Sequence, residues 1–280
     1  MAANKTEKIP GGDPLVRSPK NRHIQDFRRL DGDPGLRDQR SVLLAEGIKV
    51  MEIADQAGLE IETLLISPRV EEQTQGHALL LKLRSRGIVP IHLTKALMDY
   101  TYGSQGHQGI LGVIRRPAGK LEPLLIPGSE PLFFYGIGIQ DPGNVGALVR
   151  SADAFGAAGV LLSPGTADPY GRRAVRASMG STLRIPVIKK CETRDTLVRL
   201  RSAGIRCLAT DSRRGTVPWQ ANLKGGIAVL FGAEGTGLSE EVLGSVDATI
   251  RIPMRAGVDS INVAAAASLI GYETARRRAR

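Results

Sequence analysis

The sequence predicts an α/β protein with two domains, the second of which carries a parallel sheet covered by helices on both faces. Apolar runs of strand length alternate with amphipathic segments over most of the 280 residues, which is the pattern of parallel strands joined by helices. The alternation is stricter after residue 131 than before it. Residues 117–130 hold prolines and glycines without any period, which is typical of a linker.

Composition favours a polyanionic partner. The chain has 38 Lys and Arg against 28 Asp and Glu, a formal charge of +10, which indicates nucleic acid or an acidic membrane surface. A merely basic enzyme is the alternative. No apolar run is long enough to cross a bilayer, so we predict no membrane-spanning segment. Aromatic residues make up 4% of the chain and leave few surfaces on which bases could stack.

Cysteine usage predicts no metal site. Cys191 and Cys207 are far apart and share no metal-ligand spacing with any of the four histidines, so we expect neither zinc nor another metal. The polar N-terminus has no pattern of a secretion or transit peptide. We therefore predict a cytoplasmic protein with free thiols.

The first part of the chain divides in two. Residues 1–37 are basic, carry glycine and proline clusters and lack a sustained period, which predicts a mobile basic N-terminal arm. Residues 38–116 predict a small α/β sandwich. Its expected strands are 41–45, 61–66, 88–93 and 110–114, and its expected helices are 48–57, 75–86 and a short one near 96–98.

The second domain, residues 131–280, is expected to hold the chemistry. Its predicted strands are 132–139, 159–162, 183–188, 205–209, 227–231 and 249–252. Its predicted helices are 144–155, 172–179, 195–202, a short one from Ser239 and a last one from about Ile261 to Arg278. Ligands of such open sheets bind outside the carboxyl ends of the strands.

A polar turn, Gln140 to Gly146, follows the first strand of this domain. Asn144 stands where the N-cap of the next helix belongs. At about 100° per residue, Arg150 projects roughly 140° from the centre of that helix's apolar face. It is therefore a surface residue, either a solvated charge or a functional one. The apolar face consists of Val145, Leu148, Val149, Ala152 and Phe155.

A basic cluster occupies residues 171–190, which contain no Asp or Glu. Six positive charges without local compensation favour contact with a phosphate backbone over a solvated face. We assign this phosphate-backbone contact to Arg172, Arg173 and Arg176. The cluster also includes Arg184, Lys189 and Lys190.

Two loops near the carboxyl end predict one pocket. The apolar run 227–231 leads into Gly232 to Gly237, a loop with three glycines and Glu234, and the run 249–252 leads towards Ser260 and Asn262. Glycines let the backbone approach a ligand closely, although a ligand-free turn explains the loop nearly as well. Ser260 and Asn262 would equally serve as caps of the last helix.

Three motifs, taken in their order along the chain, closely resemble those of the SpoU (TrmH-like) RNA ribose methyltransferases of the SPOUT superfamily. They are Asp141 to Gly146 with Arg150, Phe231 to Ser239, and Ile252 to Met254 with Ser260 to Val263. The resemblance covers about residues 130–275, and Arg176 to Ser181 is similar to a further turn of the family. Residues 40–115 resemble the family's N-terminal RNA-binding domain, which shares a fold with a large-subunit ribosomal protein.

The resemblance implies a Rossmann-like sheet with a deep trefoil knot at its carboxyl end, a homodimer, and bound S-adenosylmethionine. It gives Arg150 the catalytic role, Asn144 the task of holding the ribose or Arg150, and Glu234 that of ordering the pocket. Ser260 and Asn262 would shape the cofactor and substrate sides. The cofactor would bind near Thr210, Gly232, Ile252, Met254, Ile261 and Asn262. Where the family often has Val-Ser after the Asn, this chain has Val263-Ala264.

The implied reaction is transfer of a methyl group from S-adenosylmethionine to a ribose 2′-hydroxyl of structured RNA, with ribosomal RNA favoured over transfer RNA. Because guanidinium stays protonated, we expect Arg150 to clamp a phosphate and orient the hydroxyl instead of acting as a base. Two alternatives remain: a non-catalytic RNA-binding protein on the same scaffold, and a nicotinamide-dependent oxidoreductase built on Gly136-Ile137-Gly138. The second is disfavoured because the loop lacks a third glycine and an acid in ribose-binding register.

Overall fold

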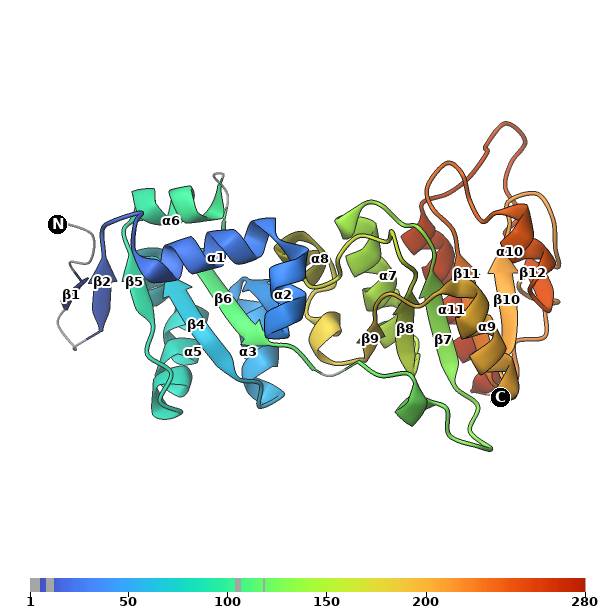
Figure 1. Ribbon diagram of the computed structural model, residues 1–280, viewed down its shortest axis with the longest axis horizontal. Coiled ribbons are helices and arrows are strands. Elements are labelled where there is room, and N and C mark those ends of the chain that lie inside the picture. Colours follow the sequence, from blue (N-terminus) through green and yellow to red (C-terminus); the bar gives the residue numbers. More distant parts are fainter. Residues whose placement is uncertain (1–5, 9–12, 104–106, 118, 280) are drawn as a thin grey trace. The chain divides into compact units, whose positions relative to one another are not determined.

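The computed structural model describes residues 6–8, 13–103, 107–117 and 119–279 (Figure 1). The chain forms two compact units. Unit 1 comprises Met1–Pro117 together with Tyr170–Leu183, and unit 2 comprises Ala118–Pro169 and Arg184–Arg280. The predicted second domain, 131–280, is therefore interrupted, because residues 170–183 pack with the first part of the chain.

Unit 1 is built on a mixed sheet in the order β1-β2-β5-β4-β6-β3. β4 pairs in parallel with β5 and antiparallel with β6, and β6 pairs antiparallel with β3. Gly112 in β6 faces Met51, whose Sδ would lie 2.8 Å from an added Cβ. The strands are β1 (Thr6–Lys8), β2 (Pro14–Val16), β3 (Val42–Glu46), β4 (Ile61–Ile66), β5 (Ile91–Leu93) and β6 (Ile110–Arg115).

Helices cover both faces of this sheet, which confirms the predicted α/β sandwich. Ile24, Phe27 and Leu30 of one helix share a buried cluster with strand residues such as Leu44 and Leu65. Met51 packs on the opposite face, against Gly112. The helices are α1 (Arg22–Gly32), α2 (Pro34–Arg40), α3 (Ile48–Gln56), α4 (Pro68–Glu72), α5 (Thr74–Ser85) and α6 (Lys95–Tyr102).

The prediction of a mobile arm over residues 1–37 is wrong for residues 14–37. They form β2, α1 and most of α2, and the apolar residues of α1 are fully buried. Ile24, Phe27 and Leu30 recur at a helical spacing that the glycine and proline clusters on either side concealed. Asn21 accepts a hydrogen bond from the His23 amide and caps the helix. Residues 1–5 and 9–12 of the predicted arm lie outside the described residues.

The segment 170–183 completes unit 1. It contains α8 (Arg172–Ala177) and the 3₁₀ turn η2 (Ser181–Leu183), and the Tyr170 carbonyl accepts a hydrogen bond of 3.1 Å from the Leu44 amide. Gly180, at φ +85°, leaves no room for a side chain, because a Cβ would lie 2.5 Å from Ile53 Cδ1. These contacts bind the segment to β3 and α3.

Unit 2 contains the predicted parallel sheet. Its strand order is β12-β10-β11-β7-β8-β9, and every neighbouring pair is parallel. All five residues of β7 and all five of β11 are buried, as expected for central strands covered on both faces. The strands are β7 (Leu132–Gly136), β8 (Gly159–Leu162), β9 (Val187–Ile188), β10 (Arg206–Thr210), β11 (Ile227–Phe231) and β12 (Ala248–Ile250).

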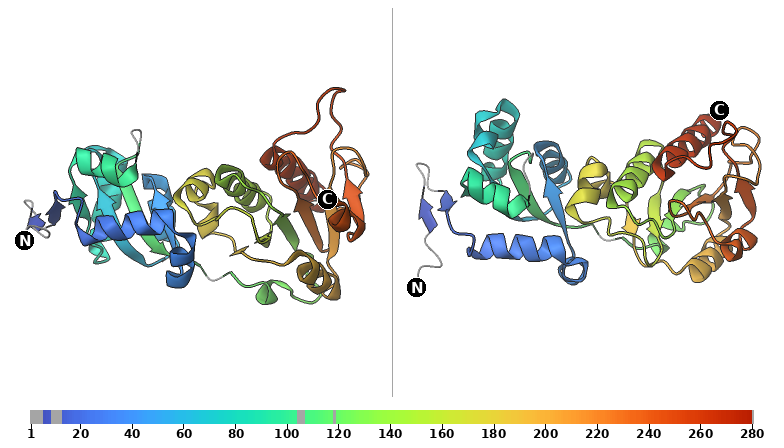
Figure 2. Two further views of the ribbon diagram at one scale, coloured as in Figure 1. Left: turned by 45° about the horizontal axis from the view of Figure 1, so that its top comes forward. Right: turned by 90° about the horizontal axis from the view of Figure 1, so that it is seen from above.

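Two helices lie side by side on one face of this sheet, α7 (Pro142–Ala154) and α11 (Val263–Arg278) (Figure 2). Ser151 and Ser268 share a hydrogen bond of 2.8 Å between them. Gly271 allows the close approach, since a Cβ there would lie 2.5 Å from the Phe155 ring. α9 (Thr193–Ser202) and α10 (Glu240–Gly244) pack their apolar residues into a separate cluster.

Residues 121–125 of the predicted linker pack against the core of unit 2. Leu121 is 3% exposed and belongs to the core of unit 2, with Leu124 and Leu125 packed against it. Glu122 starts the 3₁₀ turn η1 (Glu122–Leu124) and pairs with Arg199 of α9. The sequence did not predict the packing of these leucines, because they have no regular period and lie among prolines and glycines.

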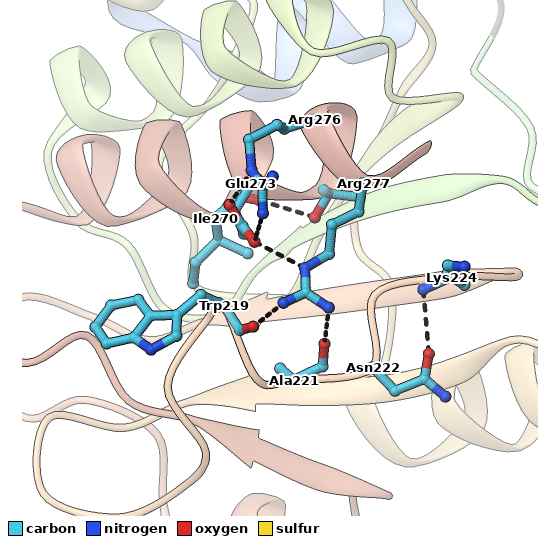
Figure 3. A network of polar contacts seen from close by, with 9 residues as sticks. Trp219, Ala221, Asn222, Lys224, Ile270, Glu273, Arg276 and Arg277 are labelled. Atoms are coloured by element: carbon cyan, nitrogen blue, oxygen red, sulfur yellow. Dashed lines mark hydrogen bonds and ion pairs between the residues drawn. The ribbon is translucent and has the colours of Figure 1, made fainter. Parts of the chain in front are cut away.

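The last turns of α11 fasten the loop between β10 and β11 (Figure 3). Arg277 donates to the carbonyls of Trp219 and Ala221, and Arg278 donates to those of Glu130 and Gly225. Glu273 orients the clamp by accepting from Arg276 and Arg277 at 2.8 and 2.7 Å. Hydrogen bonds from Arg276 and Arg277 lower the pKa of Glu273 to about 2.

This shift predicts an acid-labile contribution to stability. The folded pKa lies below the ordinary value of 4.5, so the stabilisation is complete above pH 4.5 and is lost as the pH falls towards about 2. We expect Glu273→Gln to cost about 1 to 2 kcal/mol near neutrality, a figure reduced for the partly exposed arginines. Thermal unfolding from pH 7 to pH 2.5 measures it. A difference between wild type and variant that stays constant over this range would contradict the assignment.

Candidate active site

The site is built at the carboxyl edge of the sheet of unit 2. β12, β10 and β11 are neighbours and run in parallel, so the loops that follow them emerge at the same edge (Figure 1). Thr210 ends β10, Gly232 follows β11 and Ile252 follows β12. The structure thereby places three of the predicted cofactor-binding residues on adjacent strand ends.

A chain of hydrogen bonds links the three motifs. Asn144 Nδ2 donates to Glu234 Oε1 at 2.5 Å, and Asn262 Nδ2 donates to Asn144 Oδ1 at 2.8 Å. These residues are 90 and 118 positions apart in the sequence. The amide of Asn144 thus joins the first turn of α7 to the glycine-rich loop and to the start of α11.

Helix capping differs from the prediction at one of two positions. Asp141, and not Asn144, is the N-cap of α7: its carboxylate accepts from the Asn144 amide at 3.0 Å. Pro142 then occupies the first turn, where its missing N–H costs nothing. Asn262 does cap α11, since its Oδ1 accepts from the Ala264 amide at 2.8 Å. Asn144 is therefore free to use its side chain for the links between the motifs.

Arg150 lies on the exposed side of α7, while Val145, Leu148, Val149 and Ala152 are fully buried. Across the described residues, no hydrogen bond or ion pair of Arg150 is found, so of the two roles predicted for Asn144, holding the ribose or holding Arg150, the second is not seen in this structure. Its guanidinium is available to a ligand. Ser260 is also exposed, in the loop that precedes Asn262.

The glycine-rich loop folds back on its own first residue. A Cβ on Gly232 would lie 2.3 Å from the carbonyl carbon of Gly237 and 2.5 Å from the Leu238 nitrogen, and the Gly237 amide donates to the Ala233 carbonyl at 2.9 Å. Gly232 is thus required by the loop itself. Gly235 and Gly237, at φ +82° and +67°, would place a Cβ in open space. Their exposed backbone is a surface that S-adenosylmethionine can approach.

The remaining predicted cofactor residues end β10, follow β12 or precede α11. Thr210 is half-buried, and its hydroxyl donates to the Leu230 carbonyl at 2.9 Å. Ile252, Met254 and Ile261 are half-buried as well. Half-buried apolar side chains beside open backbone suit an adenosine, which needs both an apolar wall and main-chain hydrogen bonds.

The basic cluster is compensated by acids from elsewhere in the chain. Arg172 pairs with Asp31 at 2.9 Å and lies over the Tyr102 ring. Arg176 pairs with Glu46 at 3.0 Å. The premise that these charges lack partners is therefore wrong, because the acids are distant in sequence. Contact of Arg172, Arg173 and Arg176 with RNA stays a prediction.

Other predicted features concern thiols, metals and membranes. Cys191 and Cys207 are free and buried, and burial raises the pKa of Cys207 to about 12. In the part of the chain that the structure describes, no three His, Cys, Asp or Glu residues gather as a metal site would need. None of the described helices is long and apolar enough to span a bilayer.

In the turn proposed for a nicotinamide cofactor, the backbone amide of Gly138 is already hydrogen-bonded within the protein. Gly138 has φ +67°, and its amide donates to the hydroxyls of Ser163 and Thr166, each at 3.1 Å. A dinucleotide phosphate would need such amides free. The oxidoreductase alternative therefore has no support at this turn.

A parallel sheet with polar loops linked at its carboxyl edge is the architecture in which α/β proteins bind their ligands. The comparison with protein families narrows the class. Residues 131–272 match the SpoU rRNA Methylase family. The chain belongs to this family, as the three motifs predicted.

Individual relatives of the chain support this family assignment. The chain is 29% identical to a 23S rRNA (uridine(2479)-2′-O)-methyltransferase of Streptomyces viridochromogenes, over 99% of this chain and 97% of the relative. It is 28% identical to a 23S rRNA (guanosine-2′-O-)-methyltransferase of Vibrio vulnificus, over 78% and 89%. An AdoMet-bound rRNA methyltransferase from Sinorhizobium meliloti has the same fold, with a TM-score of 0.80, 29% identity and coverage of 94% and 97%.

Proposed function

We propose that this protein transfers the methyl group of S-adenosylmethionine to a ribose 2′-hydroxyl of ribosomal RNA. The observation that carries the proposal is the Glu234-Asn144-Asn262 chain, which fastens the three motif loops around the carboxyl edge of β10, β11 and β12. Two relatives, which match 99% and 78% of the chain, are 2′-O-methyltransferases of 23S rRNA.

The reaction moves one methyl group and one proton. S-adenosylmethionine supplies the methyl group from its sulfonium; the ribose oxygen gains it and releases its proton. Arg150, exposed and without a partner among the described residues, holds the phosphate next to the target ribose and orients the hydroxyl. After its bonds to Glu234 and Asn262, the side-chain amide of Asn144 has one N–H left. This N–H donates to the ribose and orients it towards the pocket.

Glu234 completes the arrangement from the glycine-rich loop. Its second carboxylate oxygen has no hydrogen bond within the described residues, so it is an acceptor for the hydroxyl proton or for a water that takes it. Ser260 supports the substrate side of the pocket. Thr210, Gly232, Ile252, Met254 and Ile261 hold the cofactor.

Isothermal titration and RNA mapping test this function. We expect binding of S-adenosylmethionine and none of a nicotinamide cofactor, and we expect one 2′-O-methyl group to be lost from the rRNA of a deletion strain and restored by the purified protein. Failure to bind S-adenosylmethionine would favour the non-catalytic RNA-binding alternative. A methyl group lost from tRNA instead would redirect the substrate.

The protein also acts as a homodimer. Leu269 and Tyr272 of α11 are 49% and 59% exposed, although the helix already buries its other side against α7. Tyr272 meets Phe155 at the end of α7 with one edge of its ring and is otherwise exposed, like Leu269. Exposed apolar residues beside a packed helix pair suit a second subunit. Sedimentation at micromolar concentration should give a dimer of the 29.9 kDa chain, and Leu269→Glu with Tyr272→Glu should give a monomer. A wild-type monomer would contradict the assembly.

Three further features accompany this function. The carboxyl-terminal loops form the trefoil knot that the family resemblance implies. The enzyme works in the cytoplasm, where ribosomal RNA is present and thiols stay reduced. Arg173, with Arg172 and Arg176 after exchange of their acid partners, contacts the RNA backbone.

A further inference from the structure

The loop that joins β10 to β11 is long and irregular. Residues 211–226 are all described, and they form neither helix nor strand. Loops of this length are uncommon in compact domains and are either functional or disordered. Hydrogen bonds fix both halves of this loop, which favours a function. It begins directly after Thr210, one of the residues that would hold the cofactor.

Arginine side chains hold the second half of the loop, partly shown in Figure 3. Arg206 of β10 and Arg277 and Arg278 of α11 together donate to five of its backbone carbonyls. Hydrogen bonds from a charged donor are stronger than those between neutral groups, so this half depends on the three arginines for its conformation. The acceptors are Asn222 and Lys224 for Arg206, Trp219 and Ala221 for Arg277, and Gly225 for Arg278.

The first half of the loop lies against the end of β12. The Thr216 amide donates to the Thr249 carbonyl, and the Arg251 amide donates to the Thr216 carbonyl, each at 3.0 Å. Gly215, at φ +117°, allows this approach, because a Cβ would lie 2.5 Å from the Thr249 oxygen. Arg251 immediately precedes Ile252. The loop therefore borders the proposed cofactor site at its own first residue and again beside Ile252.

Helix α11 connects these contacts to the three motifs. Its N-cap, Asn262, donates to Asn144 at 2.8 Å, and its last turn carries Arg277 and Arg278. Glu273, one turn before Arg277, accepts from this arginine at 2.7 Å and orients its guanidinium. The helix is thus fixed to the motif loops at its start and to the loop 211–226 at its end.

An arginine-rich carboxyl end could also serve as a surface for RNA. The side chain of Arg277 is only 23% exposed, and Arg278 is half-buried as well. Burial lowers the pKa of Arg278. Both guanidinium groups are directed at backbone carbonyls of the protein, so a structural task explains them better than a phosphate contact.

We propose that Arg277 and Arg278, together with Arg206, are positioning residues for S-adenosylmethionine, because they hold the loop 211–226 in the conformation that the cofactor needs. The inference rests on the proposed function, which supplies the cofactor. The three arginines act through the loop and not by contact with the reacting groups. Without them the loop becomes ordered only when the cofactor binds, and this ordering reduces the affinity.

Titration of Arg277→Ala with S-adenosylmethionine tests the positioning role. We expect the dissociation constant to rise about 3- to 10-fold at a temperature at which circular dichroism shows a folded variant. The KM for the cofactor should rise with it, and kcat at saturating cofactor should stay unchanged. Arg277→Lys can reach one of the two carbonyls and should recover part of the affinity.

Two further variants perturb the same loop and keep the test open if Arg277→Ala does not fold. Arg278→Ala removes one hydrogen bond to the loop and should give a smaller rise in the dissociation constant. Gly215→Ala displaces the loop from β12 and should weaken cofactor binding from the other side. Wild-type affinity in both variants would overturn the proposal.

Trp219 reports the motion of the loop directly. It is the single tryptophan of the chain, and it is 57% exposed, so its fluorescence anisotropy needs no label. We expect faster depolarisation in Arg277→Ala than in the wild type, and saturating S-adenosylmethionine should restore the wild-type decay. A lower unfolding temperature with unchanged anisotropy and an unchanged dissociation constant would leave Arg277 a purely structural role and overturn the proposal.

Arg201→Ala is the matched control. Arg201 of α9 donates to the Ser245 carbonyl, which lies in unit 2 but outside the loop 211–226. Its loss should lower the unfolding temperature, as the loss of Arg277 does, and leave the anisotropy of Trp219 and the affinity for S-adenosylmethionine unchanged. An equal loss of affinity in Arg201→Ala would overturn the proposal in favour of general destabilisation.

The wild-type titration separates this inference from the proposed function. A wild-type protein that binds S-adenosylmethionine, beside an Arg277→Ala variant with the same dissociation constant, would refute the positioning role alone. A wild-type protein that does not bind S-adenosylmethionine would refute the proposed function, and the positioning role with it, whatever the variants do.

Discussion

Arg150→Ala lowers the rate of methyl transfer below one tenth of the wild-type rate, a loss of more than about 1.4 kcal/mol of transition-state stabilisation. The reason is that Arg150 is exposed on α7, has no partner among the described residues and lies in the helix whose first turn holds Asn144. Its guanidinium can therefore hold a phosphate and orient the ribose hydroxyl. Single-turnover methylation of unmodified rRNA measures the effect.

The affinity for S-adenosylmethionine should stay nearly unchanged in this variant, because Arg150 touches the substrate side. Arg194→Ala is the matched control, since Arg194 is an exposed arginine of α9 and should keep the full rate. Arg150→Lys tests the forked geometry: it keeps the charge but loses the two parallel hydrogen bonds. A rate above one tenth in Arg150→Ala would remove Arg150 from the catalytic role.

Gly232→Ala strongly weakens the binding of S-adenosylmethionine. Even a single Cβ would lie 2.3 Å from the Gly237 backbone, so the loop 233–238 must move, and the open backbone of Gly235 and Gly237 moves with it. We expect the dissociation constant to rise more than about tenfold, together with a lower unfolding temperature. The bulkier Gly232→Val would add strain against the same backbone and could not isolate a cofactor contact.

Two glycines supply the controls for this experiment. Gly244 lies at the end of α10 with no atom within 4 Å of an added Cβ, so Gly244→Ala should bind like the wild type. Gly235→Ala is the positive control: its Cβ would enter the open space that the cofactor approaches, at a φ of +82°, so it should weaken binding although no protein atom lies within 4 Å of it. Wild-type affinity in Gly232→Ala, measured by titration, would show that the loop is not a wall of the pocket.

The sequence alone predicted the elements whose pattern is local. β4, β8 and β11 span the residues that were predicted, since each is a short run rich in apolar residues between turn residues, and its length suits a strand and not a helix. The family and its parallel sheet followed from three motifs in order. The exposed position of Arg150 followed from helical period alone, because a turn of 100° per residue fixes which side chains face the core.

Tertiary structure decided what depends on distant partners. The burial of α1, the insertion of Leu121 into a core and the docking of residues 170–183 beside β3 all depend on surfaces built elsewhere in the chain. The ion pairs of Arg172 and Arg176 also depend on tertiary structure, because their partners, Asp31 and Glu46, are distant in the sequence. The hydrogen bonds that link Asn144 to Glu234 and Asn262 could not be predicted either. No local pattern shows which strand ends will be neighbours once the sheet has formed.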